Sequence, residues 1–80
     1  MTPDWIATTL QQAMPDAVVE VRSDDNTHFE AFVVDASFEG LRPLARHQLV
    51  YKVLGDVVGR EIHALALKTL TPDEHAARGS

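Results

Sequence analysis

Cysteine is missing from this sequence of 80 residues. Disulfide bonds therefore cannot stabilise the core, and the chain has no thiolate of its own with which to hold zinc or an iron–sulfur cluster. The chain does contain four histidines, so its contribution to an iron–sulfur cluster would be limited to imidazole nitrogen.

Long apolar runs and a leader sequence are missing as well. No run approaches the roughly 18–20 residues that span a bilayer. The opening residues, MTPDW, have neither the basic region nor the apolar region of a secretory signal. We therefore expect a cytoplasmic protein that makes no contact with a membrane.

Positive charge is scarce. Twelve acidic residues oppose seven basic ones and give a net charge of −5 at pH 7. Because neutralising phosphates supplies most of the non-specific affinity for nucleic acid, this balance disfavours a dedicated DNA or RNA binder. A local basic patch is still compatible with the composition.

Motifs of catalysis are missing too. The sequence has no glycine-rich phosphate loop, no nucleophile with an ordered base, and no H-E-x-x-H zinc motif. The adjacent carboxylates Asp24-Asp25 and Asp73-Glu74 stand where a turn and a helix start explain them. We expect that the protein is not an enzyme.

The residues that are present suit one small globular domain. Single domains run from about 50 to 250 residues, and an apolar share of 45% argues against disorder. A chain this short buries a modest fraction of its surface, so a large enclosed active site is not expected. We predict one domain over residues 1–80, with residues 76–80 frayed.

Capping residues and hydrophobic periodicity predict the order α-β-β-α-α-β-α. Trp5 is expected in the core, and Gly55 is expected to weaken its helix by up to about 1 kcal/mol relative to alanine. Thr71 and Glu74 have the spacing of a capping box. The predicted segments are a helix that begins at Thr2-Pro3 and ends before Pro15, strands over 17–22 and 28–35, a helical turn within 36–42, a helix over 44–58, a strand over 61–69 and a helix from Thr71 onward.

The connections predict an α+β fold with a mixed sheet. A short loop joins the first two strands, so these should be antiparallel. A helical crossover joins the second strand to the third, so these should be parallel. This gives a three-stranded sheet in the order 1-2-3, with the apolar strand central. The second and third strands then begin at the same end of the sheet, near His28 and His63.

Each of these two histidines has an ordinary interpretation and a functional one. His63 is either a strand-edge histidine bonded to backbone or water, or a metal ligand. His28 either closes the turn before its strand or ligates a metal. Histidine has a reference pKa of about 6.5, so near pH 7 it can ligate at little cost in proton release.

Three ordered blocks of the sequence resemble the BolA family. THFEAFVV (27–34) resembles the strand that opens the BolA core, FEG (38–40) with RHQLVY (46–51) resembles its helical signature, and IHALALKTLTP (62–72) resembles its third strand and final helix start. The compact loop before His28 is similar to that of the IbaG (YrbA) subgroup.

The resemblance implies a class II KH-like fold and a heterodimer with a monothiol glutaredoxin. In such complexes a [2Fe–2S] cluster is held by thiolates of the glutaredoxin and glutathione and by side chains of the BolA partner, in cluster assembly, trafficking or iron regulation. His63 matches the family's histidine in the third strand. Members with longer loops carry another His or Cys between strands 1 and 2. Residues 23–27 contain neither, which leaves His28 as the nearest substitute.

The family's association with transcriptional control suggests an alternative role in DNA binding. Arg42, Arg46 and Lys52 can share one helix face, with His47 turned to a partner, although a solvated face is the ordinary interpretation. A KH domain clamps nucleic acid with a GXXG loop, whereas FEGLRP (38–43) has a single glycine and an acidic residue. RNA binding of the KH type is therefore disfavoured. The sequence leaves a homodimer open.

Overall fold

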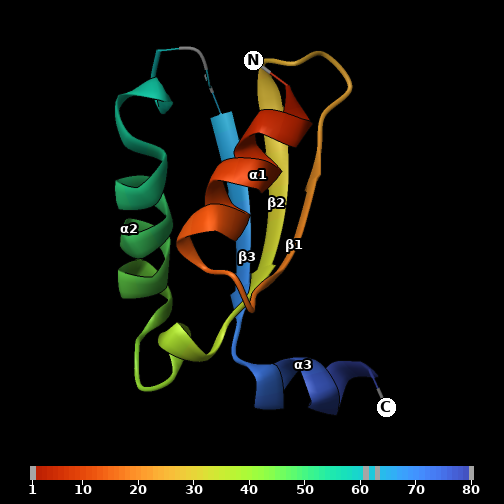
Figure 1. The fold of residues 1–80 in the computed structure, drawn as a ribbon, viewed down its shortest axis with the longest axis vertical. Coiled ribbons are helices and arrows are strands. Elements are labelled where there is room, and N and C mark those ends of the chain that lie inside the picture. Colours follow the sequence, from red (N-terminus) through yellow and green to blue (C-terminus); the bar gives the residue numbers. More distant parts are fainter. Residues whose placement is uncertain (1, 61, 63, 80) are drawn as a thin grey trace.

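The computed structural model describes residues 2–60, residue 62 and residues 64–79. Figure 1 shows how these residues are arranged. The elements, in chain order, are α1 (Pro3–Ala13), β1 (Val18–Arg22), β2 (His28–Val34), the 3-10 helix η1 (Ala36–Phe38), α2 (Pro43–Leu54), the 3-10 helix η2 (Gly55–Val57), β3 (Ala64–Leu70) and α3 (Pro72–Gly79).

The three strands form one mixed sheet in the order β1-β2-β3. β1 pairs with β2 in antiparallel fashion, and β2 pairs with β3 in parallel. His28 lies opposite Ala64, so β2 and β3 do begin at the same end of the sheet. The predicted topology is therefore confirmed, including the central position of the apolar strand.

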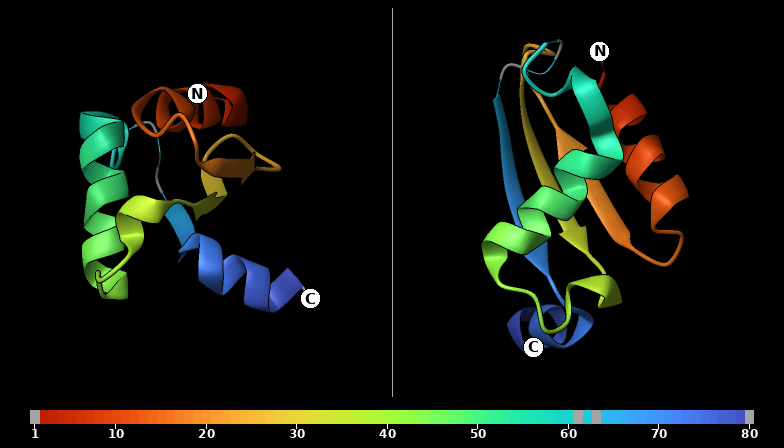
Figure 2. Two further views of the ribbon diagram at one scale, coloured as in Figure 1. Left: turned by 60° about the horizontal axis from the view of Figure 1, so that its bottom comes forward. Right: turned by 90° about the vertical axis from the view of Figure 1, so that its left-hand side faces the viewer.

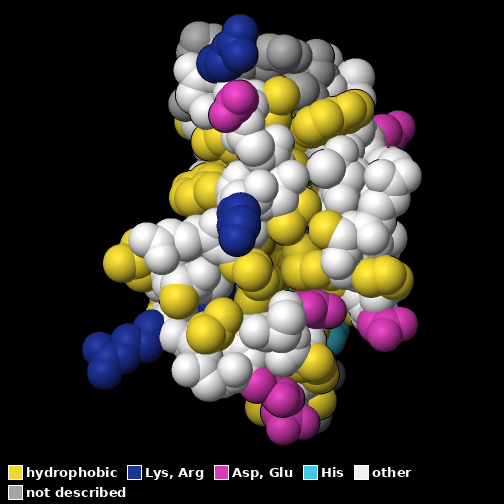
Figure 3. Space-filling view, turned by 60° about the vertical axis from the view of Figure 1, so that its left-hand side comes forward, with side chains coloured by type: hydrophobic (Ala, Val, Ile, Leu, Met, Phe, Trp, Pro, Cys, Tyr) yellow, Lys and Arg dark blue, Asp and Glu magenta, His cyan; other side chains and the backbone are white. Residues whose placement is uncertain are grey.

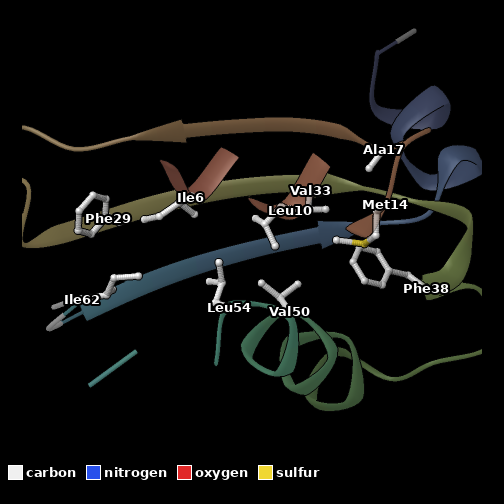
Figure 4. Close-up of a cluster of buried hydrophobic side chains, with 10 residues drawn as sticks. All are labelled: Ile6, Leu10, Met14, Ala17, Phe29, Val33, Phe38, Val50, Leu54 and Ile62. Carbon is white, nitrogen blue, oxygen red and sulfur yellow. The ribbon is translucent and has the colours of Figure 1, made fainter. Parts of the chain in front are cut away.

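One face of the sheet carries the hydrophobic core. Figure 2 shows α1 and α2 on this side, with α3 beyond the end of β3 and away from them. Figure 4 shows the side chains that meet between the two helices and β2. The buried cluster consists of Ile6, Leu10, Met14, Ala17, Phe29, Val33, Phe38, Val50, Leu54 and Ile62.

The other face of the sheet is open over much of its area. Alternate residues of β2 and β3 point away from the core, and His28, Glu30, Ala64 and Lys68 among them are exposed. At the α3 end, the ring of His75 packs edge-on against Phe32, with 5.6 Å between the ring centroids. The exposed end of this face is therefore the end where β2 and β3 begin.

Two helix starts form as the sequence predicts. The Thr2 side chain accepts a hydrogen bond from the Trp5 N–H at 3.3 Å. At α3 the Thr71 N–H donates to Glu74 Oε1 at 2.8 Å, and the Glu74 N–H donates to Thr71 Oγ1 at 3.2 Å. This reciprocal pair is the predicted capping box.

Trp5 is a correction to the sequence analysis, because its side chain is 41% exposed rather than buried in the core. The buried stripe of α1 runs through Ile6, Leu10 and Met14, which follow one another at intervals of four residues. Trp5 precedes this stripe by one residue, about 100° around a helix of 3.6 residues per turn. It therefore lies at the edge of the contact.

The long predicted helix over 44–58 is shorter than expected. α2 ends at Leu54, because Gly55 adopts φ +75° and ψ −147°, outside the helical region. The chain continues as η2, and Val57 and Val58 still pack against the core. The apolar residues of this segment therefore pack against the core as a helix would place them, but the helix itself is shorter than the apolar pattern predicted.

The last two elements are β3 over Ala64–Leu70 and α3 over Pro72–Gly79. The predicted strand start at residue 61 lies outside the described residues, and the fraying expected at 76–80 stays a prediction. The capping box and the contact of His75 with Phe32 fix the first turn of α3. None of the helices that the structure describes is long and apolar enough to cross a bilayer.

Candidate functional site

His28 stands at the open end of the sheet, where the chain leaves the turn between β1 and β2. Its side chain is 67% exposed. Ala64 lies opposite it in register, and Ala66 follows on the same face of β3. These small side chains help to line a shallow groove of about 450 Å³ that His28 also lines. The imidazole of His28 is therefore exposed at the edge of this groove.

The turn before His28 is closed by the carboxylate of Asp25. Asp25 Oδ1 accepts hydrogen bonds from the N–H groups of Thr27 and His28, both at 2.9 Å. Ser23 Oγ accepts from the Asn26 N–H at 2.9 Å and lies 2.6 Å from the carbonyl oxygen of His28, to which it can donate. Asn26 itself adopts φ +57°, a left-handed conformation that asparagine tolerates. Short polar side chains therefore define the turn.

Asp25 also contacts the ring of His28. The second carboxylate oxygen, Oδ2, lies 2.8 Å from His28 Nδ1. The pKa of Asp25 is held well below its ordinary value, first by the backbone N–H of His28, then by the His28 ring and by the N–H of Thr27. The carboxylate is therefore ionised at neutral pH, and an ionised carboxylate can only accept hydrogen bonds. A hydrogen bond between Oδ2 and the ring therefore requires a proton on Nδ1.

The described residues offer one ligand rather than a complete metal site. Within residues 2–60, 62 and 64–79, no group of three or more His, Cys, Asp or Glu side chains is placed to hold a metal ion. His63, the first of the two predicted ligands, lies outside the described residues, and its role stays a prediction. The described residues by themselves therefore form no metal site.

Arg46 is a correction to the predicted docking patch. Its side chain is only 11% exposed, and Nη1 lies 2.7 Å from Glu74 Oε1. Its Nε donates to the carbonyl of Leu41 at 2.9 Å, and Nη1 donates to the carbonyl of Thr69 at 3.3 Å. The guanidinium is directed into the fold because backbone carbonyls of two other segments need donors there. It cannot reach a partner without breaking these bonds.

The remaining members of the predicted patch do not form a compact basic surface. Arg42 and Lys52 are exposed near opposite ends of α2, and His47 is half-buried between them. On the face that α2 presents in Figure 3, the Lys and Arg side chains stand apart from one another. The exposed cationic side chains Arg42 and Lys52 are therefore separate from each other, whereas the sequence suggested that they share one face of the helix.

Sequence reasoning placed His28 at the start of its strand, as the structure does, but did not predict the contact between Asp25 and the His28 ring. The adjacent carboxylates were explained by the turn alone, which accounts for Oδ1 and not for Oδ2. The signal was present in the sequence, because an Asp in a tight turn three residues before a His can bond both the backbone and the ring. A search for such Asx turns would have found it.

Comparisons with known proteins agree on one family. The family described as BolA-like protein matches residues 7–74. BolA-like protein 1 of Homo sapiens is 40% identical over 76 residues, covering 84% of this chain and 56% of the relative, so the chain spans about half of that protein's length. The DNA-binding transcriptional regulator BolA of Vibrio cholerae is 50% identical over 48 residues, covering 60% of this chain and 45% of the relative.

A solved structure shows the same arrangement of helices and strands. The bolA protein homologue from Coxiella burnetii superposes with a TM-score of 0.82 at 40% sequence identity. The superposition covers 95% of this chain and 97% of the other.

Proposed function

Because the chain belongs to the BolA family, we propose that it is an adaptor that pairs with a monothiol glutaredoxin and lends histidine ligands to a shared [2Fe–2S] cluster. Its role would lie in cluster assembly, cluster trafficking or iron regulation. The observation that carries this proposal is the exposed ring of His28, held through Nδ1 by Asp25 so that Nε2 is free.

The absence of cysteine supports a division of labour between two proteins. Iron–sulfur clusters are held by four thiolate ligands, and histidine replaces two of them in Rieske centres. This chain has no thiolate, so the sulfur ligands would come from the glutaredoxin and its glutathione. The bound cluster would supply the iron that accepts the imidazole lone pairs. The chain itself would present and orient those imidazoles.

His63 is the ligand that the family resemblance assigns, and His28 is the candidate for a second. The register pairs His28 with Ala64, the residue that follows His63 in the chain. The register therefore places the start of β2 beside the start of β3, and the role of His63 in the same site rests on the family resemblance. The ring of His63 lies outside the described residues, so two-point ligation is a proposal.

The proposal is tested by reconstitution. The protein is mixed under anaerobic conditions with a monothiol glutaredoxin, glutathione, ferrous iron and sulfide, and the visible absorption and circular dichroism are recorded. We expect a heterodimer whose spectrum differs from that of the cluster-bridged glutaredoxin homodimer. His63→Ala should lose this spectrum, whereas His75→Ala, on α3 at the far end of the sheet, should keep it. A His63→Ala spectrum identical to wild type would remove the ligand assignment.

DNA binding is a second candidate, favoured by the name of the Vibrio cholerae relative and by the exposure of Arg42 and Lys52. The net charge of −5 and the inward direction of Arg46 weigh against it. Binding through phosphates would weaken steeply as salt rises. An isotherm on duplex DNA that is unchanged between low and physiological salt, or unchanged by Arg42→Ala with Lys52→Ala, would exclude this candidate.

A further inference from the structure

We infer that Asp25 is a positioning residue, whose carboxylate holds the imidazole of His28 in the tautomer that leaves Nε2 free to ligate a metal held by a partner. The value of this arrangement for ligation rests on the proposed function. The tautomer is a property of the chain alone and can be measured without any cluster.

The two oxygens of Asp25 have separate tasks. Oδ1 is occupied by the backbone N–H groups of Thr27 and His28, both at 2.9 Å, which fixes the carboxylate against the turn. Oδ2 is left for the ring and lies 2.8 Å from Nδ1. Because the backbone and the ring of His28 bond to the same carboxylate, the ring cannot turn over without giving up a charge-assisted hydrogen bond.

The turn keeps the carboxylate in place before any ligand arrives. Ser23 Oγ lies 2.6 Å from the carbonyl oxygen of His28, to which its single proton can be donated, and it also lies 3.3 Å from Asp25 Oδ1. The turn is also bounded by a paired strand on each side, with Arg22 opposite Glu30. An exposed histidine is thus given one orientation by neighbours that are themselves anchored.

The chemistry of the pair fixes which nitrogen is free. A carboxylate accepts and does not donate, so Nδ1 must be the protonated nitrogen of the neutral ring. A free histidine side chain in water favours the other tautomer, with the proton on Nε2. Metal-ligating histidines commonly donate their second ring N–H to a carboxylate, which raises ligand basicity and fixes the ring. Asp25 and His28 have this arrangement already in the isolated chain.

Asp25→Asn is the matched variant. The amide oxygen of asparagine can keep both backbone bonds at the Oδ1 position, but its NH₂ group replaces Oδ2 and can only donate. It would therefore favour an unprotonated Nδ1 and move the proton to Nε2. The corresponding Asp-to-Asn change in a serine-protease triad leaves the geometry intact and gives the wrong histidine tautomer. Asp24→Asn removes the same charge one residue away and is the control.

The measurement is a long-range ¹H–¹⁵N correlation spectrum of the histidine rings in the isolated full chain at a pH where His28 is neutral. We expect wild type and Asp24→Asn to show a protonated Nδ1 and a free Nε2 for His28, and Asp25→Asn to show the reverse. If wild type shows a protonated Nε2, or if Asp25→Asn leaves the tautomer unchanged, the inference is overturned.

A second measurement links the tautomer to ligation. In the reconstituted heterodimer, loss of a partner that orients a metal ligand typically costs about 10–100-fold in metal affinity. We expect Asp25→Asn to raise, by a factor in this range, the concentration of this chain that gives half of the maximal heterodimer spectrum, and Asp24→Asn to leave that concentration unchanged. A reversed tautomer with an unchanged half-maximal concentration would overturn the role in ligation. A wild-type chain with the expected tautomer but no heterodimer would instead count against the proposed function.

Discussion

Arg46 joins three separate parts of the molecule through one guanidinium group. Its bonds reach the carbonyl of Leu41 before α2, the carbonyl of Thr69 near the end of β3, and the carboxylate of Glu74 in α3. Lysine could not reproduce this pattern, because an ammonium lacks the planar fork that serves several acceptors at once. The residue is therefore structural, although the sequence places it among candidate binding residues.

We predict that Arg46→Ala destabilises the fold by about 1–3 kcal/mol, because it leaves partly buried carbonyl oxygens without a donor. Arg42→Ala is the matched control, since Arg42 is exposed and makes no capping bond through its side chain. That change should stay within about 0.5 kcal/mol of wild type. Equilibrium unfolding in urea measures both, and equal stabilities of the two variants would contradict the structural role of Arg46.

The ion pair between Arg46 and Glu74 depends on pH through the carboxyl group of Glu74. The hydrogen bond from Arg46 is the largest cause that lowers the pKa of Glu74, followed by the N–H of Thr71. A carboxyl whose folded pKa is lowered contributes stability above its unfolded pKa, about 4.3 for glutamate, and loses it as the pH falls through the folded value. Acid should therefore weaken the contact among α2, β3 and α3.

We predict that Glu74→Gln is less stable than wild type at pH 7 and that the difference shrinks below about pH 4.3, the reference pKa of glutamate. Thermal unfolding across pH 7 to 3 measures it. In an Arg46→Ala background the substitution should have a smaller effect, because the largest cause of the shift is gone. A difference between wild type and Glu74→Gln that does not depend on pH would exclude this linkage.

The hydrogen bonds of single side chains could be predicted where the bonding partner is close in sequence. Thr71 and Glu74 form a capping box that three residues of spacing suffice to predict. Arg46 and Glu74 are 28 residues apart, and no local pattern links them. Asp25 falls between these cases, because its turn was predictable and its bond to the His28 ring depends on the side-chain conformation that the turn imposes.

At the scale of elements, the strand order followed from the short loop between β1 and β2 and from the helical crossover between β2 and β3, whereas the end of α2 did not follow from the apolar pattern. Val53, Val57 and Val58 all pack against the core, as a continuous helix would place them. Gly55 nevertheless ends α2 with a backbone conformation that favours glycine. The spacing of apolar residues indicates which residues pack against the core. It does not show where the α-helix α2 gives way to the 3-10 helix η2.

The substitution Gly55→Ala distinguishes a continuous helix over 44–58 from an α2 that ends at Leu54. Helix propensity alone predicts that alanine stabilises a helix interior by up to about 1 kcal/mol. The structure predicts the opposite sign, a destabilisation of about 1–3 kcal/mol, because φ +75° with ψ −147° strains any residue with a Cβ. No heavy atom lies within 4 Å of the added Cβ, so the effect would come from the backbone alone. A higher urea midpoint for Gly55→Ala would show that α2 continues through this position.

At the scale of the whole molecule, the fold buries one face of its sheet and leaves the other open at the end where β2 and β3 begin. The sequence predicted this meeting of strand starts, and the register of His28 with Ala64 confirms it. The ligand role of His63 rests on the family resemblance. Under the proposed function, the imidazole of His28 at this open end would help to complete a metal centre built by another protein.

Pulsed EPR of the reduced heterodimer cluster tests this claim most directly. The chain is prepared with ¹⁵N-labelled histidine, the glutaredoxin and glutathione are left unlabelled, and the hyperfine couplings to nitrogen are recorded. We expect ¹⁵N couplings from imidazole bound to iron, and we expect these couplings to decrease in His63→Ala and in His28→Ala. A heterodimer cluster without any coupling to ¹⁵N from this chain would contradict it.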